Sequence, residues 1–119
     1  MLPKASRMRS APEFRRTIRS GVRAGRPTVV VSALRADPQA VCVRVGFVVS
    51  KAVGNAVTRN RVKRRLRHLS RDWLGRTPTG TCVVVRALPP AADPDAQLAE
   101  DLSGAWQTCL DRLEKRGGR

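Results

Sequence analysis

An amphipathic pattern between residues 51 and 76 most constrains how this chain can fold. Four apolar residues in it step by four, three and four positions, which is the spacing of one face of an α-helix. They are Val62, Leu66, Leu69 and Trp73. The pattern predicts a helix over about 58–74 that turns one face to a core, with Asn55 or Thr58 as its N-cap and an end near Gly75.

The rest of this helix surface is almost entirely positive. The 51–76 segment contains nine basic residues and one acid, Asp72. Cations at that density repel each other at i,i+3 and i,i+4 spacing, and nothing within the segment relieves the repulsion. A solvated face is the ordinary explanation of a charged helix, but charge of a single sign favours an external counter-charge. A phosphate backbone is the natural one.

The composition supports a polyanionic partner. The 119 residues suffice for one domain, 1–119, with a modest core. The net charge is +15 and the pI is near 11.7, which indicates binding to nucleic acid. Arginine outnumbers lysine 20 to 4. Arginine grips phosphate with a planar fork, although codon bias in a GC-rich genome gives the same excess. The four aromatic residues are too few for recognition mainly by base stacking.

The N-terminal part predicts an arm followed by a helix. Residues 1–9 form a short basic arm. Ser10 to Glu13 has the form of a capping box with a proline in the first turn, and Gly21 suits a helix end. A helix of about ten residues is therefore expected between them.

Three apolar, β-branched stretches predict strands, at 28–34, 41–50 and 81–87. The first two follow each other across a turn at Asp37-Pro38, so we expect them to pair antiparallel. The third follows the basic helix and is apolar enough to lie inside the sheet. We expect it to run parallel to the second, through a crossover that is right-handed by default.

The C-terminal part predicts one more helix. Asp93-Pro94 suits an N-cap and first turn, and an apolar stripe then continues to Arg116, with 117–119 as a tail. This helix fits a structural lid on the sheet. Together the elements predict an α+β or α/β two-layer sandwich, with a small mixed sheet and about three helices.

The sequence offers little for catalysis or metal binding. Its three cysteines, Cys42, Cys82 and Cys109, lack the spacing of metal ligands, and we expect them to be small buried hydrophobes. The single histidine, His68, lies among arginines, and the carboxylates are scattered. We expect no catalytic residue and no metal site in the protein. The chain lacks a signal-peptide pattern or an apolar span, so we expect it in the cytoplasm.

Four stretches together resemble the protein-subunit family of bacterial ribonuclease P. They are LPK at 2–4, the segment from Arg7 to Phe14, RVGFVVSKAVGNAVTRNRVKRRLR at 44–67 and VVVRA at 83–87. The central block is specific in both length and residue choice. The resemblance extends from about residue 2 to residue 113.

This resemblance implies a fold similar to a domain of a small-subunit ribosomal protein, with a left-handed crossover in place of the default right-handed one. It implies a ribozyme, in which an RNA subunit carries the active site and its Mg2+ ions and removes the 5′ leader from precursor tRNA. The protein would bind that RNA and hold the leader in a cleft between its first helix and the sheet. Membranes and DNA are not expected partners.

The resemblance also implies which residues lie at RNA. Those of the basic block are Lys51, Asn55, Arg59, Asn60, Arg61, Lys63, Arg64 and Arg67. Those of the leader cleft are Phe14, Ile18, Phe47 and Ser50. Ile18 and Ser32 stand where the family often has aromatic residues, so less stacking of leader bases is expected here. Both phenylalanines also suit an ordinary core.

Other functions remain open from composition alone. A structural RNA-binding protein of ribosomal type, without a role in cleavage, is the main alternative. An amphipathic helix acting on anionic membranes fits less well, because the apolar stripe is needed for the core and is poor in aromatics. A protein-only nuclease would need clustered carboxylates.

Overall fold

A mixed sheet forms the centre of the fold. The computed structural model describes residues 6–8, 10–36, 39–40 and 42–117. The sheet has four strands in the order β1-β2-β4-β3. The elements in chain order are α1 (Ala11–Ser20), β1 (Val22–Gly25), β2 (Val29–Arg35), β3 (Arg44–Val48), α2 (Ala56–Leu74), β4 (Thr81–Ala87), the 3-10 helix η2 (Pro89–Ala92) and α3 (Leu98–Gly117).

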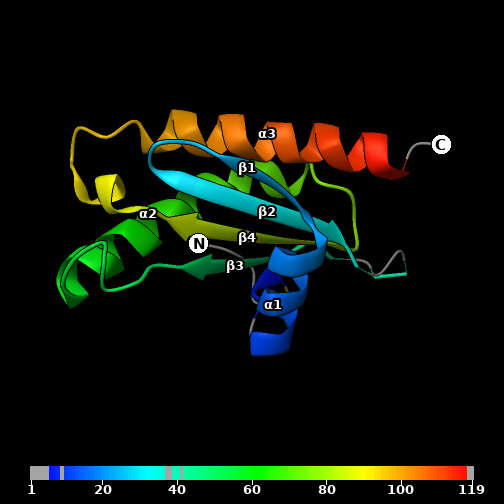
Figure 1. Cartoon of the computed structure of the whole chain (residues 1–119), viewed down its shortest axis with the longest axis horizontal. Coiled ribbons are helices and arrows are strands. Elements are labelled where there is room, and N and C mark those ends of the chain that lie inside the picture. Colours follow the sequence, from blue (N-terminus) through cyan, green and yellow to red (C-terminus); the bar gives the residue numbers. More distant parts are fainter. Residues whose placement is uncertain (1–5, 9, 37–38, 41, 118–119) are drawn as a thin grey trace.

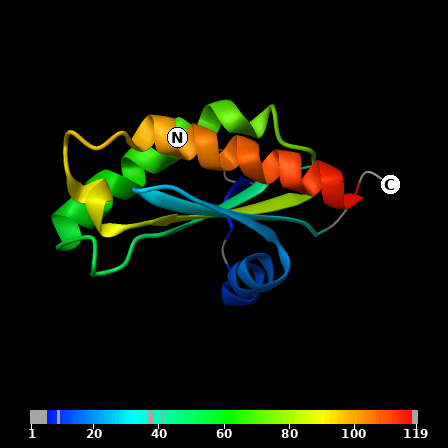
Figure 2. The same cartoon turned by 45° about the horizontal axis from the view of Figure 1, so that its top comes forward.

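Helices cover both faces of this sheet (Figures 1 and 2). α2 and α3 lie on one face and enclose the main core, which includes Leu66 and Trp106. α1 crosses the other face over a smaller cluster of Met8, Cys82 and Val84. The α+β class with a small mixed sheet, expected from the sequence, is confirmed.

The strand order differs from the prediction at one point. The first two predicted strands were expected to pair, but β4 lies between β2 and β3. It pairs antiparallel with β2, placing Val85 opposite Val31, and parallel with β3, placing Val83 opposite Val45. The prediction is wrong because β4 has six of seven residues buried and takes the central position. The parallel crossover through a helix is confirmed, and its handedness stays a prediction.

β1 is a strand that the sequence analysis missed. It has only four residues, alternately buried and exposed, so it lacks a long apolar run. A tight turn pairs it with β2, and the Arg26 N–H donates to the Val29 carbonyl at 2.8 Å. Asp101 of α3 holds this turn by accepting from the N–H and the hydroxyl of Thr28, at 3.1 and 2.7 Å. Tertiary contacts, not local propensity, therefore define β1.

Side-chain caps begin α1 and α2 as the sequence predicts. The Ser10 hydroxyl accepts from the Glu13 N–H at 3.3 Å. The Asn55 side-chain oxygen accepts from the Thr58 N–H at 2.9 Å, so Asn55 and not Thr58 is the cap of α2. Each bond satisfies one of the free donors of a first helical turn.

α3 begins later than predicted. The sequence suggests a start at Asp93-Pro94, but the helix begins at Leu98. Asp93 follows η2 and its carboxylate accepts from the Asp95 N–H at 2.9 Å. An Asp-Pro pair suits such a turn as well as a helix start, and local sequence does not distinguish the two.

Two tryptophans join α2 to α3. The Trp73 and Trp106 rings stack with centroids 6.0 Å apart. The Thr77 hydroxyl donates to the Trp73 carbonyl at 2.7 Å and accepts from the Trp106 ring N–H at 2.9 Å. This buried network fixes the end of α2 against the middle of α3.

No helix in the described part of the chain is long and apolar enough to cross a membrane.

Candidate nucleic-acid interface

α2 buries one face and presents a cationic one. Val62, Leu66 and Trp73 are buried as predicted, and Leu69 is half-buried. Ser70 is also buried, a position that the apolar pattern did not include. The residues Asn60, Arg61, Arg64, Arg65, His68 and Arg71 are exposed, while Arg59, Lys63 and Arg67 are half-buried. The two-faced helix expected from the sequence is confirmed.

The described chain does not neutralise these cations. Its described residues form one ion pair, between Arg44 and Glu13, and that pair lies away from α2. Arg59 also has a buried Nε atom without a hydrogen-bond partner among the described residues. A buried charged group without a partner is costly, so an external anion is the arrangement that best satisfies this surface.

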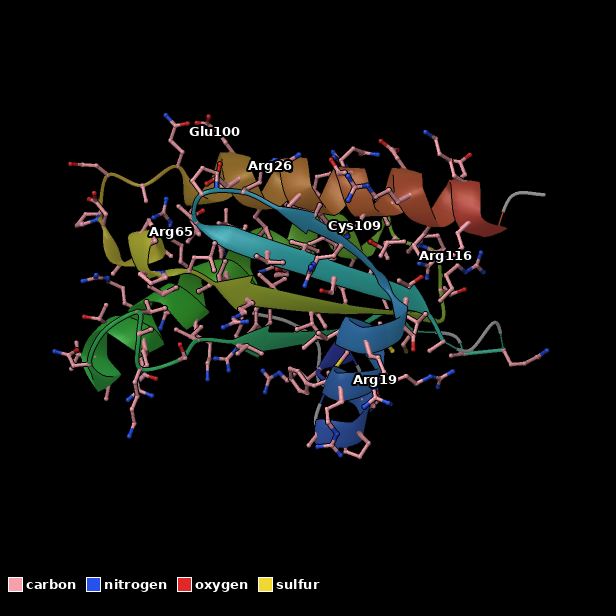
Figure 3. The ribbon with its side chains drawn as sticks, viewed as in Figure 1. Arg19, Arg26, Arg65, Glu100, Cys109 and Arg116 are labelled. Carbon is pink, nitrogen blue, oxygen red and sulfur yellow. The ribbon has the colours of Figure 1, made fainter. Side chains whose placement is uncertain are left out.

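The cations of α2 point to two sides of the helix. Arg61 and Arg65 lie toward η2, and Figure 3 shows Arg65 there. The Arg61 guanidinium donates to the Ala92 carbonyl at 3.0 Å. Lys63 and Arg67 lie toward the outer edge of β3. The second pair is the more informative, because it faces a concave surface.

That surface is a hollow of ≈ 340 Å³, here called the β3-edge hollow. It is lined by Arg7, Met8, Phe14, Val45, Gly46, Phe47, Lys63 and Arg67. Arg7 enters it because the N-terminal segment pairs with β3, and the Met8 N–H donates to the Val45 carbonyl at 2.9 Å. The Arg7 Nε atom is buried and has no partner among the described residues. Three cations and two phenylalanines thus surround one hollow.

Phe14 reaches this hollow because Gly46 has no side chain. A Cβ atom at Gly46 would lie 2.4 Å from the Cζ atom of Phe14, which is shorter than van der Waals contact allows. Phe14 also packs against the cluster of Met8, Cys82 and Val84. Its ring therefore has both roles that the sequence left open, as part of a small core and as a wall of the hollow.

A second hollow of ≈ 290 Å³, here called the β1-side hollow, lies on the sheet face that α1 crosses. It is lined by Ile18, Arg23, Gly25, Val30, Ser32, Val84 and Arg86. Ile18 is 45% exposed, and it lies one helical turn beyond Phe14. The two hollows together border α1, with arginines at both ends, two phenylalanines in the first hollow and small or aliphatic residues in the second.

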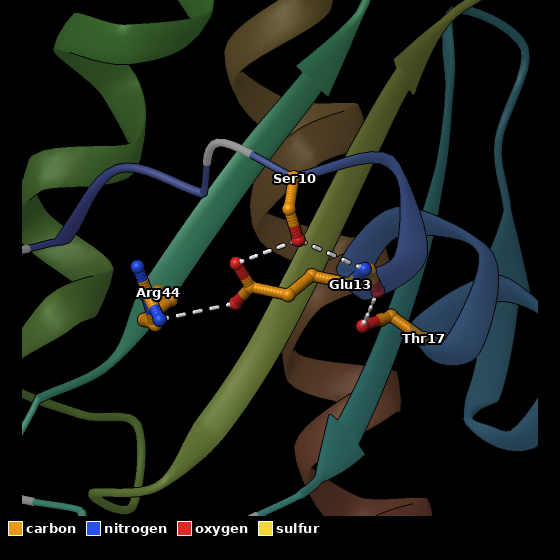
Figure 4. Close-up of polar contacts among 4 residues, drawn as sticks. All are labelled: Ser10, Glu13, Thr17 and Arg44. Atoms are coloured by element: carbon orange, nitrogen blue, oxygen red, sulfur yellow. Dashed lines mark hydrogen bonds and ion pairs between the residues drawn. The ribbon is translucent and has the colours of Figure 1, made fainter.

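A polar network holds α1 over the sheet (Figure 4). The Glu13 carboxylate accepts from the Ser10 hydroxyl at 3.2 Å and pairs with Arg44 of β3 at 3.2 Å. The Thr17 hydroxyl donates to the Glu13 carbonyl at 2.9 Å, and Thr17 is 1% exposed. Glu13, which the Ser10 cap contacts, thereby also fixes the helix relative to β3.

The predicted site residues do not all meet at one place. The structure brings Phe14, Phe47, Lys63 and Arg67 together at the β3-edge hollow. Ile18 lines the other hollow. Ser50 lines neither, and its carbonyl accepts from the Val53 N–H at 3.1 Å in the loop after β3. Lys51 and Asn55 are exposed in the same connection, beside the start of α2.

Three arginines of these hollows were missed by sequence reasoning. They are Arg7, Arg23 and Arg86. Arg7 lies in the predicted basic arm, and Arg23 lies in a strand too short to recognise. Arg86 carried a readable signal, because it is the one charged residue in an otherwise apolar strand. Among the described residues, no group of three or more His, Cys, Asp or Glu side chains is placed to hold a metal ion.

Known proteins of one family match this chain along most of its length. The family model for ribonuclease P matches residues 2–110. A ribonuclease P protein component of Kocuria rhizophila is 56% identical, over 94% of this chain and 98% of that one. Its counterpart in Streptomyces avermitilis is 55% identical, over 92% and 96%.

Solved structures give the same result. A Staphylococcus aureus RNase P protein mutant with defective mRNA degradation activity matches with a TM-score of 0.79 at 26% identity, over 88% of each chain. The RNase P protein from Thermotoga maritima matches with a TM-score of 0.70 at 24% identity, over 89% and 96%, which shows a common fold.

Proposed function

The chain belongs to the ribonuclease P protein family, and from that premise we propose how its surface is divided between two RNAs. As a protein component of ribonuclease P, it takes part in tRNA processing and partners with the ribonuclease P RNA. We assign the cationic face of α2 to that RNA. We assign the two hollows beside α1 to the 5′ leader of precursor tRNA.

The β3-edge hollow carries this proposal. Arg7, Lys63 and Arg67 converge there beside the rings of Phe14 and Phe47. Cations bind the phosphate backbone without regard to sequence, and the parts of the two half-buried rings that line the hollow add contact to bases. This combination suits a leader whose sequence differs from one precursor to the next.

The β1-side hollow continues the proposed leader path. Arg23 and Arg86 lie at its rim, and its floor contains Ser32 and Val84 in place of aromatic rings. Contacts there are therefore made to phosphates more than to bases. A single-stranded leader crosses from α2 toward β1 in this arrangement, passing Phe14 and Ile18 on α1.

In this proposal the RNA subunit carries out the cleavage and holds the Mg2+ ions. Arginine and lysine line the β3-edge hollow, and they repel a divalent cation. The same cations lower the repulsion between two RNA backbones, which is the contribution we assign to the protein. An assembly of this kind is expected in the cytoplasm, where precursor tRNA is made in bacteria.

The direct experiment is leader removal from a precursor tRNA at low magnesium. The RNA subunit alone, the protein alone and the two together are compared. We expect efficient cleavage only from the pair. Cleavage by the protein alone would place an active site in the protein. Binding of RNA without any gain in cleavage would support the alternative of a structural RNA-binding protein.

A variant separates the two RNAs. Arg23→Gln with Arg86→Gln removes the two rim cations of the β1-side hollow while leaving α2 intact. We expect weaker binding of precursor tRNA that carries a leader, a salt slope smaller by about 1.4 for two single-strand phosphate contacts, and unchanged affinity for the RNA subunit. An equal loss with leaderless tRNA would contradict the assignment to the leader.

A further inference from the structure

The outer edge of β1 is covered by arginine side chains. Because the Arg26 N–H pairs with the Val29 carbonyl, the antiparallel alternation turns the carbonyls of Arg23 and Gly25 away from β2. Arg112 of α3 donates to the Arg23 carbonyl, and Arg26 donates to the Gly25 carbonyl at 2.8 Å. The free edge of the sheet is thus capped from its side.

A third arginine extends this row to the end of α1. The Arg116 guanidinium donates to the Ser20 carbonyl at 2.7 Å. We call Arg26, Arg112 and Arg116 the edge arginines. Figure 3 labels two of them, Arg26 at the turn after β1 and Arg116 near the end of α3, so the row follows the whole strand.

The charge of α3 is distributed so that this row stays positive. Asp111 and Glu114 lie on the other side of the helix, in a hollow that they share with Arg35 and Arg76. The described chain has no ion pair at the edge arginines, since its one ion pair is that of Arg44 with Glu13. Arg26 is half-buried and also donates to the Thr108 hydroxyl at 3.0 Å, so the exposed Arg112 and Arg116 are the cations of the row that are available to an external anion.

Capping alone does not account for this choice of residue. A strand edge is protected by short length or by any charged side chain, and one donor suffices for one carbonyl. A guanidinium has five N–H donors in a fixed fork. Arg112 and Arg116 are exposed and each places one nitrogen on a carbonyl. The carbonyl bond fixes the side chain in advance, which lowers the entropy lost when a second partner binds.

We propose that the edge arginines are an additional binding site for the phosphate backbone of RNA, continuous with the β1-side hollow. Arg23 belongs to both, because its side chain lines the hollow and its carbonyl accepts from Arg112. A strand that leaves the hollow at Arg23 meets Arg112 and Arg116 next. This proposal rests on the proposed leader path and extends that path beyond the hollow. The edge arginines would add affinity for RNA that is long enough to reach them.

The phosphates have two sources, the distal part of a long leader or the RNA subunit, and leader length separates them. Affinity of the protein–RNA holoenzyme is measured for precursor tRNAs with a short and a long leader over a series of salt concentrations. Affinity of the protein for the RNA subunit is measured in the same way. The wild type is compared with Arg112→Gln plus Arg116→Gln.

We expect the variant to lose the advantage of the long leader, with a salt slope smaller by about 1.4 for two contacts to a single strand. Short-leader affinity should not change. A slope reduction of the same size in binding of the protein to the RNA subunit, together with equal holoenzyme affinity losses for the short-leader and long-leader precursors, would assign the site to the RNA subunit instead. Unchanged slopes in all three measurements overturn the proposal and leave the edge arginines as caps only.

Matched variants control for charge and folding. Arg35→Gln plus Arg76→Gln removes the same charge from the mixed-charge hollow of α3 and should leave the slopes unchanged. Arg112→Lys plus Arg116→Lys retains the charge and should keep the wild-type salt slope, but with a smaller long-leader advantage because lysine lacks the fixed fork. If the double variant is poorly folded, Arg116→Gln alone replaces it, and the expected change in salt slope is then about half as large. Failure of the proposed leader path would give a different result, because Arg23→Gln plus Arg86→Gln would then leave the affinity for the short-leader precursor unchanged.

Discussion

α2 and α3 pack on the same face of the sheet but differ in their outer surfaces. They are 19 and 20 residues long. α3 places Glu100 and Asp101 in its first turn and Lys115 and Arg116 in its last, as the helix dipole favours. α2 has no acid in its first turn and carries cations along its length. The outer surface of α2 therefore departs from what stabilises a helix, and this departure is a reason to propose it as the surface that binds RNA.

The inner faces of the two helices should contribute equally to the stability of the fold. Leu66 of α2 and Leu102 of α3 are both 0% exposed. Each Leu→Ala substitution should lower the free energy of unfolding by about 2–5 kcal/mol, through lost burial and a residual cavity. Urea denaturation followed by circular dichroism measures both. A cost below about 1 kcal/mol for Leu66→Ala alone would show that α2 is not part of the common core.

The joint between the helices should be the next most sensitive point. Thr77→Val removes the hydroxyl that accepts from the ring N–H of Trp106 and leaves that donor buried without a partner. We expect a loss of about 1–3 kcal/mol. Thr77→Ser keeps the hydroxyl and is the matched control in the same denaturation experiment. Equal stability of the Val and Ser variants would contradict the role given to this bond.

One substitution should separate stability from binding in α2. Val57 is 76% exposed in the first turn. Val57→Glu should raise the free energy of unfolding by about 0.3–1 kcal/mol, because an acid there complements the helix dipole, and it should weaken binding to the RNA subunit. Val57→Gln controls for size. A variant that gains stability without losing RNA affinity would place the RNA away from this end of α2.

At neutral pH the smallest effect is that of the buried thiol in α3. Burial raises the pKa of Cys109 to about 11, from an ordinary value of 9.0. The thiol therefore keeps its proton to a higher pH in the folded state than in the unfolded state. The free energy of unfolding falls as the pH rises from about 9 to about 11. Cys109→Ala should lose less stability over that range than the wild type. If stability falls equally with pH in the variant and the wild type, the pKa of the Cys109 thiol is not raised by folding.

The sequence predicted what local patterns determine. The period of α2, the Ser10 cap and the strand at 81–87 depend on neighbours in the chain, and all were predicted correctly, while the α2 cap was left open between Asn55 and Thr58. The interior position of β4 was also predicted, from its apolar sequence, but the expected pairing of the first two strands was based on chain order, which does not show that β4 lies between β2 and β3. The same reason hid β1, which is defined by its turn and by Asp101.

The candidate site was predictable to a similar degree. The basic block was visible because its charge lies on one helix, and the structure places Lys63 and Arg67 of that block at a hollow with Phe14. Arg7, Arg23 and Arg86 arrive from three other segments, so only the fold brings them near. Their roles at RNA, like those of the residues implied by the family resemblance, stay predictions.

The most direct test of the account is the salt dependence of binding between the protein and the ribonuclease P RNA. Arg64→Gln plus Arg71→Gln, two exposed positions on the cationic face of α2, is compared with Arg35→Gln plus Arg76→Gln, which removes equal charge. Two lost phosphate contacts should make the slope of log affinity against log salt smaller by about 1.4–1.8, for single or double strands, in the first variant only. Equal slopes for both variants and the wild type would contradict the claim that the cationic face of α2 binds the ribonuclease P RNA.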